Sequence, residues 1–293
     1  MIKVKVPATS ANIGPGFDSL GLALNLYNKF AFEEIPQGLE ITGCDGRYKN
    51  KYNLVYRAAI KTLVKIGYKV SGLRIHMETT IPPSRGLGSS AACILGGVLG
   101  ANKLAGMPLS KEDILGIATG IEGHPDNIAP ALLGGLVVSI LEDKKVYSSQ
   151  VPVAKGIKFI ALVPDFTLST KKARAVLPSN VPYKDAVYNV GRVSLLLSAF
   201  SSGRFDLLKL GVKDSLHQPY RGDLIQGFQS ILEKSEELGS LGVYLSGAGP
   251  TIMAMVEEDN MDFIREIRNY LDSMNYKWNV LDLEMDLCGA VYE

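Results

Sequence analysis

The sequence predicts a protein of mixed α/β class, because strand-like and helix-like patterns occur in both halves of the chain. Residues 2–6, 20–34 and 72–79 resemble strands, whereas residues 53–66 carry apolar side chains at the three- and four-residue spacing of a helix. Hydrophobic residues make up 46% of the chain and charged residues 21%, which is typical of a globular protein with a sizeable core.

The length of 293 residues, at roughly 150 residues per domain, predicts two domains or one large one. We place the boundary so that the domains are 1–152 and 153–293.

In the first half of the chain, small and apolar residues occupy every face from Ser90 to Leu104, which predicts a buried helix. Ser110 followed by Asp113 resembles a capping box, so a second helix is expected to start at residue 111. The elements expected here are strands at 2–6 (stopped by Pro7), 20–34, 72–79 and 136–141, a turn at 12–18, and helices at 53–66, 90–104 and 111–121.

In the second half, two short apolar runs are separated by the turn sequence GAGP, which predicts a pair of strands. The remaining runs alternate between strand and helix patterns. The elements expected here are strands at 157–163, 243–246, 251–256 and 278–292, and helices at 185–201, 223–238 and 260–274.

Charge and cysteine content exclude several classes of protein. Lys and Arg number 31 and Asp and Glu 30, so the formal net charge of +1 argues against a general nucleic-acid binder. Cys44, Cys93 and Cys288 have neither disulfide-framework nor zinc spacing and are expected to be free thiols in a reducing cytosol. The apolar stretch at 128–141 is too short to span a bilayer and contains Pro130. We therefore expect a soluble cytoplasmic protein with no membrane or nucleic-acid partner and no signal peptide.

The stretch PPSRGLGSSAA, residues 82–92, has the composition of an anion site. Its glycines allow the backbone to approach a phosphate, and the helix that follows presents free N–H groups and a positive dipole end. Its serines add hydroxyl donors or a magnesium ligand.

Other interpretations of this stretch remain open at this point. A strand-to-helix turn also needs flexible glycines. The dinucleotide fingerprint GxGxxG/A fits literally, but Pro82 and Pro83 stand where a strand is required, and no acidic residue ends a second strand. A Walker A loop is excluded because no GK[ST] follows.

Residues 122–127 place two acids, an imidazole and an amide at the end of a helix. A solvated polar loop is one interpretation of this segment. Zinc is not expected, because only one histidine lies here. Glu122 suits Mg²⁺ instead, since that ion is often held by one carboxylate together with nucleotide phosphates.

A third stretch, LSGAGPT at 245–251, is by itself a weak signal of a tight turn. Thr170 and Arg174 lie four residues apart and would share a helical face. The remaining polar candidates, each taken alone, are more typical of surface residues: Asn12, Asp18, Thr170, Arg174 and Arg221.

Together these stretches resemble the signature motifs of the GHMP kinases, the superfamily of galactokinase and the homoserine, mevalonate and phosphomevalonate kinases. The motifs are PATSANIGPGFDSLGLAL at 7–24, PPSRGLGSSAA at 82–92 and LSGAGPT at 245–251. The first of these and EGHPDNIAPALLGG at 122–135 are similar to the homoserine kinases in particular. The resemblance covers essentially the whole chain.

This resemblance implies an N-terminal domain of ribosomal-protein-S5-like α/β type that holds ATP and a ferredoxin-like C-terminal α+β domain, with the active site between them. It implies phosphorylation of the side-chain hydroxyl of L-homoserine by Mg-ATP, a step toward threonine, and it leaves a homodimer open.

Carried over residue by residue, the resemblance assigns three groups of residues. Ser90 and Glu122 are expected to hold Mg²⁺. Nucleotide contacts are expected from Asn53 and from Pro82, Pro83, Ser84, Arg85, Gly86, Leu87, Gly88, Ser89, Ser90, Ala91 and Ala92. Amino-acid contacts are expected from Asn12, Asp18, His124, Asp126, Thr170, Arg174 and Arg221.

Asn127 falls where mevalonate-type relatives carry a candidate catalytic aspartate. An amide cannot take a proton, so the resemblance implies in-line attack with no dedicated protein base. Gly120 departs from the helix-forming residue expected there and weakens that helix end. A noncatalytic binding protein of the same fold is the competing hypothesis. Among enzymes, the alternative is a kinase for another hydroxyl acceptor.

Overall fold

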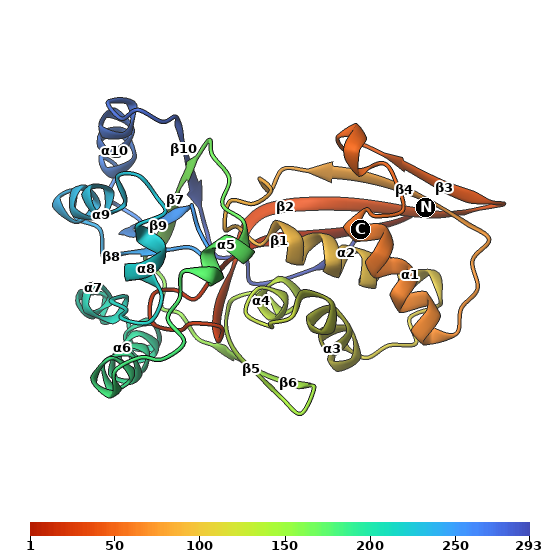
Figure 1. Cartoon of the computed structure of the whole chain (residues 1–293), viewed down its shortest axis with the longest axis horizontal. Helices are drawn as coiled ribbons and strands as arrows, with labels where there is room; N and C mark the ends of the chain where they lie inside the picture. Colours follow the sequence, from red (N-terminus) through yellow and green to blue (C-terminus); the bar gives the residue numbers. More distant parts are fainter.

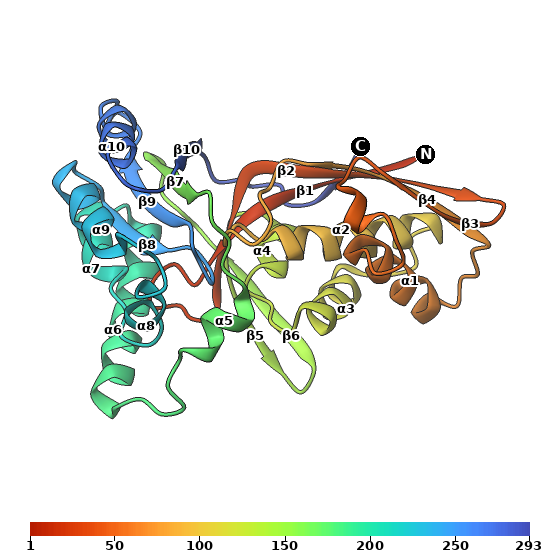
Figure 2. The same ribbon diagram turned by 45° about the horizontal axis from the view of Figure 1, so that its top comes forward.

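The computed structural model describes residues 1–293 and contains two β-sheets that lie beside one another along the long axis (Figure 1). Each sheet carries its own helices, and α5 (Thr170–Ala175) lies where the two halves meet in both views (Figure 2). The predicted α/β class is confirmed. None of the helices combines the length and the apolar character needed to cross a bilayer.

The first sheet has seven strands and is built mainly from the first half of the chain. Its main path runs β11-β1-β2-β4-β3, with β5 and β6 branching from β2, and every pair except β3–β4 is antiparallel. The strands are β1 (Ile2–Ala11), β2 (Leu20–Ile35), β3 (Gly38–Thr42), β4 (Gly72–Thr79), β5 (Leu136–Glu142), β6 (Lys145–Val151) and β11 (Val291–Tyr292).

The second sheet is antiparallel, with the order β10-β7-β9-β8. Its apolar face packs against α9 and α10 through Ile160, Ile231 and Ile267, which are all buried. The strands are β7 (Ile157–Pro164), β8 (Gly242–Leu245), β9 (Ile252–Glu257) and β10 (Trp278–Leu283).

The helices associated with the first sheet are α1 (Leu54–Ile66), α2 (Ser89–Leu104), α3 (Lys111–Glu122) and α4 (Ile128–Leu133). Those of the second half are α5 and then α6 (Tyr183–Ser202), α7 (Leu208–Gly211), α8 (Gln218–Gly222), α9 (Phe228–Glu237) and α10 (Phe263–Asp272). Two short 3₁₀ turns occur at Gly46–Tyr48 and Phe205–Leu207.

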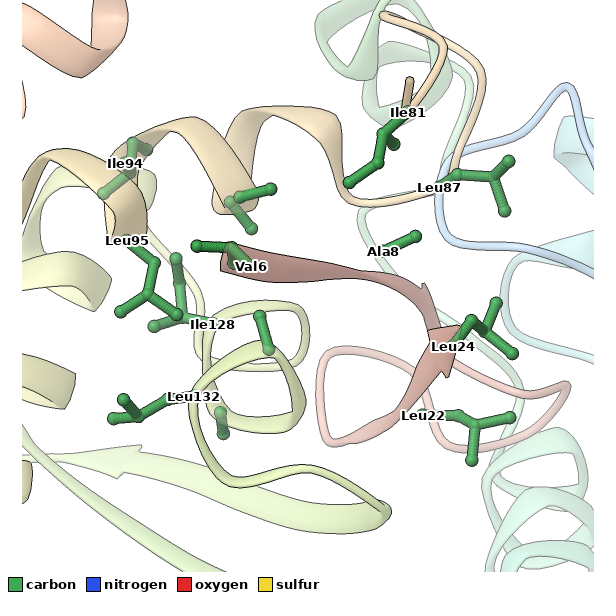
Figure 3. Close-up of a cluster of buried hydrophobic side chains, with 14 of the residues drawn as sticks. Val6, Ala8, Leu22, Leu24, Ile81, Leu87, Ile94, Leu95, Ile128 and Leu132 are labelled. Atoms are coloured by element: carbon green, nitrogen blue, oxygen red, sulfur yellow. The ribbon is translucent and has the colours of Figure 1, made fainter. Parts of the chain in front are cut away.

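The core of the first half joins β1 and β2 to α2 and α4. Figure 3 shows Val6 of β1 facing Leu95 of α2 and Ile128 of α4, and all three are at most 1% exposed. Leu87, from the glycine-containing loop that precedes α2, is fully buried in the same cluster. The loop is therefore anchored in the core by its middle residue.

Several sequence predictions were wrong in detail. Pro7 does not end the first strand, because the register shifts between Pro7 and Ala8 and this bulge accommodates a residue without an N–H. The helix predicted from residue 223 begins at Phe228, since α8 and Gly227, with φ +77°, precede it. The strand predicted over 278–292 is divided into β10 of the second sheet and β11 of the first.

Several short elements were not predicted: the strands β3 and β6, the helices α4, α5, α7 and α8, and the two 3₁₀ turns. The helix α4 contains Pro130 in its first turn, where a missing N–H costs no helical hydrogen bond. The domain boundary after residue 152 stays a prediction. It falls between β6 and β7, while β11 returns the end of the chain to the first sheet.

Candidate active site

A polar cavity opens at the junction of the two sheets, and most of the predicted site residues meet there. Its walls come from the turn after β1, the loop before α2, the loop between α3 and α4, the helices α5 and α8, and the turn after β8. The lining residues are Asn12, Asp18, Ser84, Arg85, Gly86, Gly88, Ser89, Ser90, Glu122, His124, Asp126, Asn127, Leu168, Thr170, Arg174, Arg221, Gly247, Ala248 and Gly249.

A second cavity shares Ser84, Ser89 and Ser90 with the first and extends toward α1. Pro82, Pro83 and Asn53 line this second cavity. Of the predicted nucleotide contacts, Leu87, Ala91 and Ala92 line neither, because their side chains are fully buried in the core.

The loop before α2 leaves the first turn of that helix open to an anion. Gly88 is the residue before the helix, and no side chain caps the N–H groups that follow it. Unpaired N–H groups and the helix dipole together favour a negative group at this position. The helix α2 is 16 residues long, so its aligned backbone dipoles add up at this end.

The two glycines of the loop are required by close contacts within the protein. Gly86 has φ +79°, and a Cβ there would overlap the carbonyl oxygen of Ser246. Gly88 has φ +67°, and a Cβ there would overlap Oγ1 of Thr9. The expectation that these glycines mainly give a phosphate access to the backbone is thus incomplete, since each also allows the loop to press against a neighbouring strand or turn.

Side-chain hydrogen bonds hold the loop against the second sheet. Ser246, in the turn after β8, donates its hydroxyl proton to the Gly86 carbonyl oxygen at 2.6 Å. The Arg85 side chain donates to the carbonyl oxygens of Pro164, at 2.8 Å, and Asp165, at the end of β7. The weak LSGAGPT signal therefore belongs to the same site as the glycine–serine loop.

Ser90 and Glu122 bring a hydroxyl and a carboxylate together beside that loop. The Ser90 hydroxyl donates to Glu122 Oε2 at 2.8 Å, although the two residues belong to α2 and α3. Burial raises the pKa of Glu122 above its ordinary value, and the hydrogen bond from Ser90 opposes this effect. A hydroxyl and a carboxylate are hard oxygen donors, which fit Mg²⁺ completed by phosphate oxygens and water.

The HPDN segment forms a small polar network at the start of α4. His124 Nδ1 lies 2.5 Å from Asp126 Oδ1. Burial lowers the pKa of His124, but the hydrogen bond and the negative charge of Asp126 outweigh it, and the net shift is upward. The Thr9 hydroxyl donates to Asn127 Oδ1 at 2.7 Å, which turns the amide N–H groups of Asn127 toward Asp126 and the cavity.

Arg174 of α5 also lines the cavity and forms a bidentate ion pair with Asp18. Its Nη1 and Nη2 donate to the two carboxylate oxygens at 3.0 and 2.6 Å. Asp18 belongs to the turn 12–18, and Asn12 holds this turn by accepting from the Asp18 N–H and donating to the Gly247 carbonyl oxygen. Thr170 begins α5, so it shares the short helix with Arg174 as predicted.

Arg221 of α8 is 1% exposed yet lines the cavity. Its Nε donates to the Ala173 carbonyl oxygen and its Nη1 to the Gly247 carbonyl oxygen, both at 3.1 Å. Burial, and next the charge of Arg174, lower the pKa of Arg221 to about 10, so the guanidinium remains positive at neutral pH. A buried cation of this kind gains from a partner anion in the cavity.

Asn53 has a structural role at the rim of the second cavity. Its side-chain oxygen accepts from the N–H groups of Val55 and Tyr56 at the start of α1, and its amide donates to the Tyr48 carbonyl oxygen. Its side-chain amide already has backbone partners on both atoms. Asn53 lines the second cavity, and its contact with a nucleotide stays a prediction.

Sequence reasoning did not assign Leu168, Gly247, Ala248 and Gly249 to the cavity wall, nor Thr9 to the support of Asn127. LSGAGPT was noticed, but only the packing of the two sheets brings it against the turn 12–18. Phe17 was also missed. Its ring centroid lies 5.5 Å from the guanidinium carbon of Arg174 and 5.0 Å from that of Arg221, so the ring packs against both cations.

Comparison with known proteins agrees with this arrangement. The model of the GHMP kinases N terminal domain matches residues 53–135, and that of the GHMP kinases C terminal matches residues 196–272. The homoserine kinase of Clostridium botulinum (strain Kyoto / Type A2) is 55% identical over 291 residues, which cover 99% of this chain and 98% of the relative. The homoserine kinase of Clostridium beijerinckii is 50% identical, with the same shares covered.

Solved structures give the same result at the level of the fold. The crystal structure of homoserine kinase from Cytophaga hutchinsonii matches with a TM-score of 0.90 at 29% identity, covering 100% of this chain and 97% of that one. The L. major mevalonate kinase, at 18% identity, has the same fold with a TM-score of 0.75 and covers 96% of this chain and 94% of its own. With half or more of its residues identical to those of full-length relatives, the chain belongs to the homoserine kinases of the GHMP kinase family.

Proposed function

We propose that this protein transfers the γ-phosphoryl group of ATP to the side-chain hydroxyl of L-homoserine, giving O-phospho-L-homoserine and ADP. The observation that carries the proposal is the meeting of an open helix terminus, a hydroxyl–carboxylate pair and two arginines around one cavity. These three features serve a phosphate chain, a divalent cation and an amino-acid carboxylate respectively.

We propose that the nucleotide spans the two adjoining cavities. Its phosphates bind the N–H groups at the start of α2, where Ser89 and Ser90 line both cavities. Its base and ribose extend into the second cavity, whose apolar wall includes Met77, Ile81 and Cys93. A largely apolar cleft with a few polar groups is the usual setting for such a ring.

Ser90 and Glu122 would hold Mg²⁺. When bound, the ion supplies neutralisation of the charge that develops between the β- and γ-phosphates. The raised pKa of Glu122 reflects burial of a carboxylate with one hydroxyl partner, and such a group gains stability from a nearby cation.

The carboxylate and the ammonium group of the acceptor are bound by different side chains that line the cavity. Arg221 has no protein partner on Nη2, so this nitrogen is available for the carboxylate. Asp126 uses only Oδ1 within the protein, which leaves Oδ2 for the ammonium group. Arg174 is engaged by Asp18 and contributes positive charge from the side.

Asn127 donates rather than accepts hydrogen bonds at the reacting end of the cavity. Its oxygen is occupied by Thr9, so the amide N–H groups are the ones that face outward. An N–H donor stabilises negative charge on oxygen but removes no proton. Positioning and charge neutralisation therefore carry the transfer, which suits a loose phosphoryl-transfer transition state.

The test is a coupled ADP-release assay with purified protein, Mg-ATP and four acceptors: homoserine, mevalonate, shikimate and galactose. We expect turnover with homoserine well above the others. Equal or better use of another acceptor would assign the protein to a different kinase activity, and no turnover with any acceptor would favour a noncatalytic binding protein. The cytoplasmic location and the homodimer stay predictions.

A further inference from the structure

A buried polar cluster lies directly beneath the acceptor side of the cavity, outside the set of residues that line it. It consists of Asn189 of α6, and Asp214 and His217 before α8. The side chains of Asp214 and His217 are fully buried and lie 3.6 Å apart. The reaction proposed above uses neither of these titratable groups.

The hydrogen bonds of His217 fix which ring nitrogen carries the proton. Nε2 lies 2.7 Å from the carbonyl oxygen of Gly14, which only accepts, so Nε2 is the N–H donor. Burial lowers the pKa of His217, and the ring is neutral at neutral pH. Nδ1 is therefore left with a lone pair.

That lone pair faces the buried arginine of the cavity. Nη1 of Arg221 lies 3.5 Å from His217 Nδ1. The ring of His217 also stacks on Phe17, with centroids 5.2 Å apart, and Phe17 in turn packs against the Arg221 guanidinium at 5.0 Å. His217 thus contacts Arg221 both directly and through Phe17.

The same ring fastens the turn 12–18, which forms the other side of the acceptor pocket. Besides the bond from His217 to Gly14, Asn189 donates to the Pro15 carbonyl oxygen at 3.2 Å. Asp214 holds the cluster together by accepting from the Asn189 side-chain amide at 2.6 Å and from the backbone N–H of His217 at 2.9 Å. One buried cluster therefore supports both the turn and the arginine.

We propose that His217 is a positioning residue for the amino-acid acceptor, which holds the Arg221 guanidinium in place for the substrate carboxylate and fixes the turn 12–18 beside it. This proposal rests on the function proposed above. It predicts that His217 affects binding of the acceptor but not binding of ATP.

The test uses His217→Gln in the full chain. The Gln side chain is long enough to keep donating to Gly14, but it has no acceptor where Nδ1 lies. We expect the KM for homoserine to rise about tenfold, as for loss of one hydrogen bond to a charged group. We expect the KM for ATP to stay within about twofold, because α2 and its loop do not contact the cluster.

Two further variants make the result specific. His76→Gln is the matched control, since His76 is exposed on β4 and bonds only Thr42, and we expect its kinetics to equal those of the unmodified protein. In an Arg221→Leu background, His217→Gln is expected to add little further loss in kcat/KM for homoserine, because the residue that it positions is gone.

Thermal melting of each variant establishes that it folds. A folded His217→Gln protein with an unchanged KM for homoserine, an equal rise in both KM values, or a fully additive loss in the double variant would overturn the proposal. Failure of the unmodified protein to phosphorylate homoserine would instead reject the function on which the proposal rests.

Discussion

Individual residues around the cavity hold charge where burial makes charge costly. Glu122 is the clearest case, because burial raises its pKa and only Ser90 donates a side-chain hydrogen bond to it. A carboxyl whose folded-state pKa is raised stabilises the fold fully below the unfolded pKa. That contribution is lost as the pH rises through the folded-state pKa. Glu122 therefore contributes less to stability at neutral pH than in acid.

Glu122→Gln is expected to lower the activity of the protein and to raise its stability. The variant keeps the size of the side chain and removes its charge, so we expect kcat to fall and the magnesium concentration for half-maximal rate to rise. We also expect a higher melting temperature than the unmodified protein at pH 7, and a smaller difference at pH 4. Activity titrated with Mg²⁺ and thermal melting at both pH values measure this; unchanged magnesium dependence would make Glu122 only a helix-end residue.

Arg221→Leu addresses recognition of the acceptor. A hydrogen bond to a charged group contributes about 1.5–3 kcal/mol. We therefore expect kcat/KM for homoserine to fall by about tenfold to somewhat over a hundredfold, with ATP binding nearly intact. Calorimetry with ATP and steady-state kinetics with homoserine measure the two effects. The exposed Arg57 of α1 is the control: Arg57→Leu is expected to change neither, and normal use of homoserine by Arg221→Leu would remove that residue from the acceptor site.

At the scale of single elements, glycines in two neighbouring helices have opposite roles. In α2, a Cβ on Gly96 or Gly100 would overlap the rings of Phe30 or Phe32, and a Cβ on Gly97 would overlap a carbonyl oxygen of α1. These glycines let α2 pack closely between the sheet and α1. In α3, a Cβ on Gly120 would meet no atom within 4 Å.

These environments predict opposite effects of the same substitution. Gly120→Ala removes backbone freedom from the unfolded chain and fills open space, so it is expected to stabilise the protein by about 1 kcal/mol. Gly97→Ala forces α1 and α2 apart and is expected to destabilise it by about 1–3 kcal/mol. Urea unfolding measures both free energies. A destabilised Gly120→Ala protein would mean that the end of α3 needs glycine for a reason other than space.

At the scale of the whole molecule, a few buried hydrogen bonds join the two sheets at the glycine–serine loop. Ser246 is fully buried, and its hydroxyl lies 2.7 Å from that of Ser10 on β1 and 2.6 Å from the Gly86 carbonyl oxygen. Thr251 of the same turn donates its N–H to the Arg85 carbonyl oxygen. The loop thus depends on the second sheet for its position.

Ser246→Ala removes this connection. Because it leaves buried polar partners unpaired, we expect a loss of about 1–3 kcal/mol in the free energy of unfolding and a higher KM for ATP. Ser235→Ala is the matched control: the Ser235 hydroxyl is buried without a partner in α9, so we expect its removal to cost little. Urea unfolding and ATP kinetics measure both variants; equal stability of the two would show that the Ser246 contacts contribute nothing.

The sequence alone determined the class of the fold and most of its elements. Strand and helix periods depend on local side-chain order, so β4 was predicted with its observed bounds, and α1 and α3 to within a residue of theirs. The resemblance to the GHMP kinases then predicted one cavity for residues as distant as Asn12 and Arg221, and the structure places both on its wall.

How those residues are held depends on contacts between parts of the chain that are distant in sequence. The division of 278–292 between two sheets depends on which edge strand lies within reach, and the continuation of β1 through Pro7 depends on a bulge against β2. The role of His217 could not be predicted either, because nothing in the neighbouring sequence distinguishes it from any other buried histidine. Its role depends on the hydrogen bond to Gly14, which lies 203 residues away in the chain, so that contact exists only once the two halves have packed together.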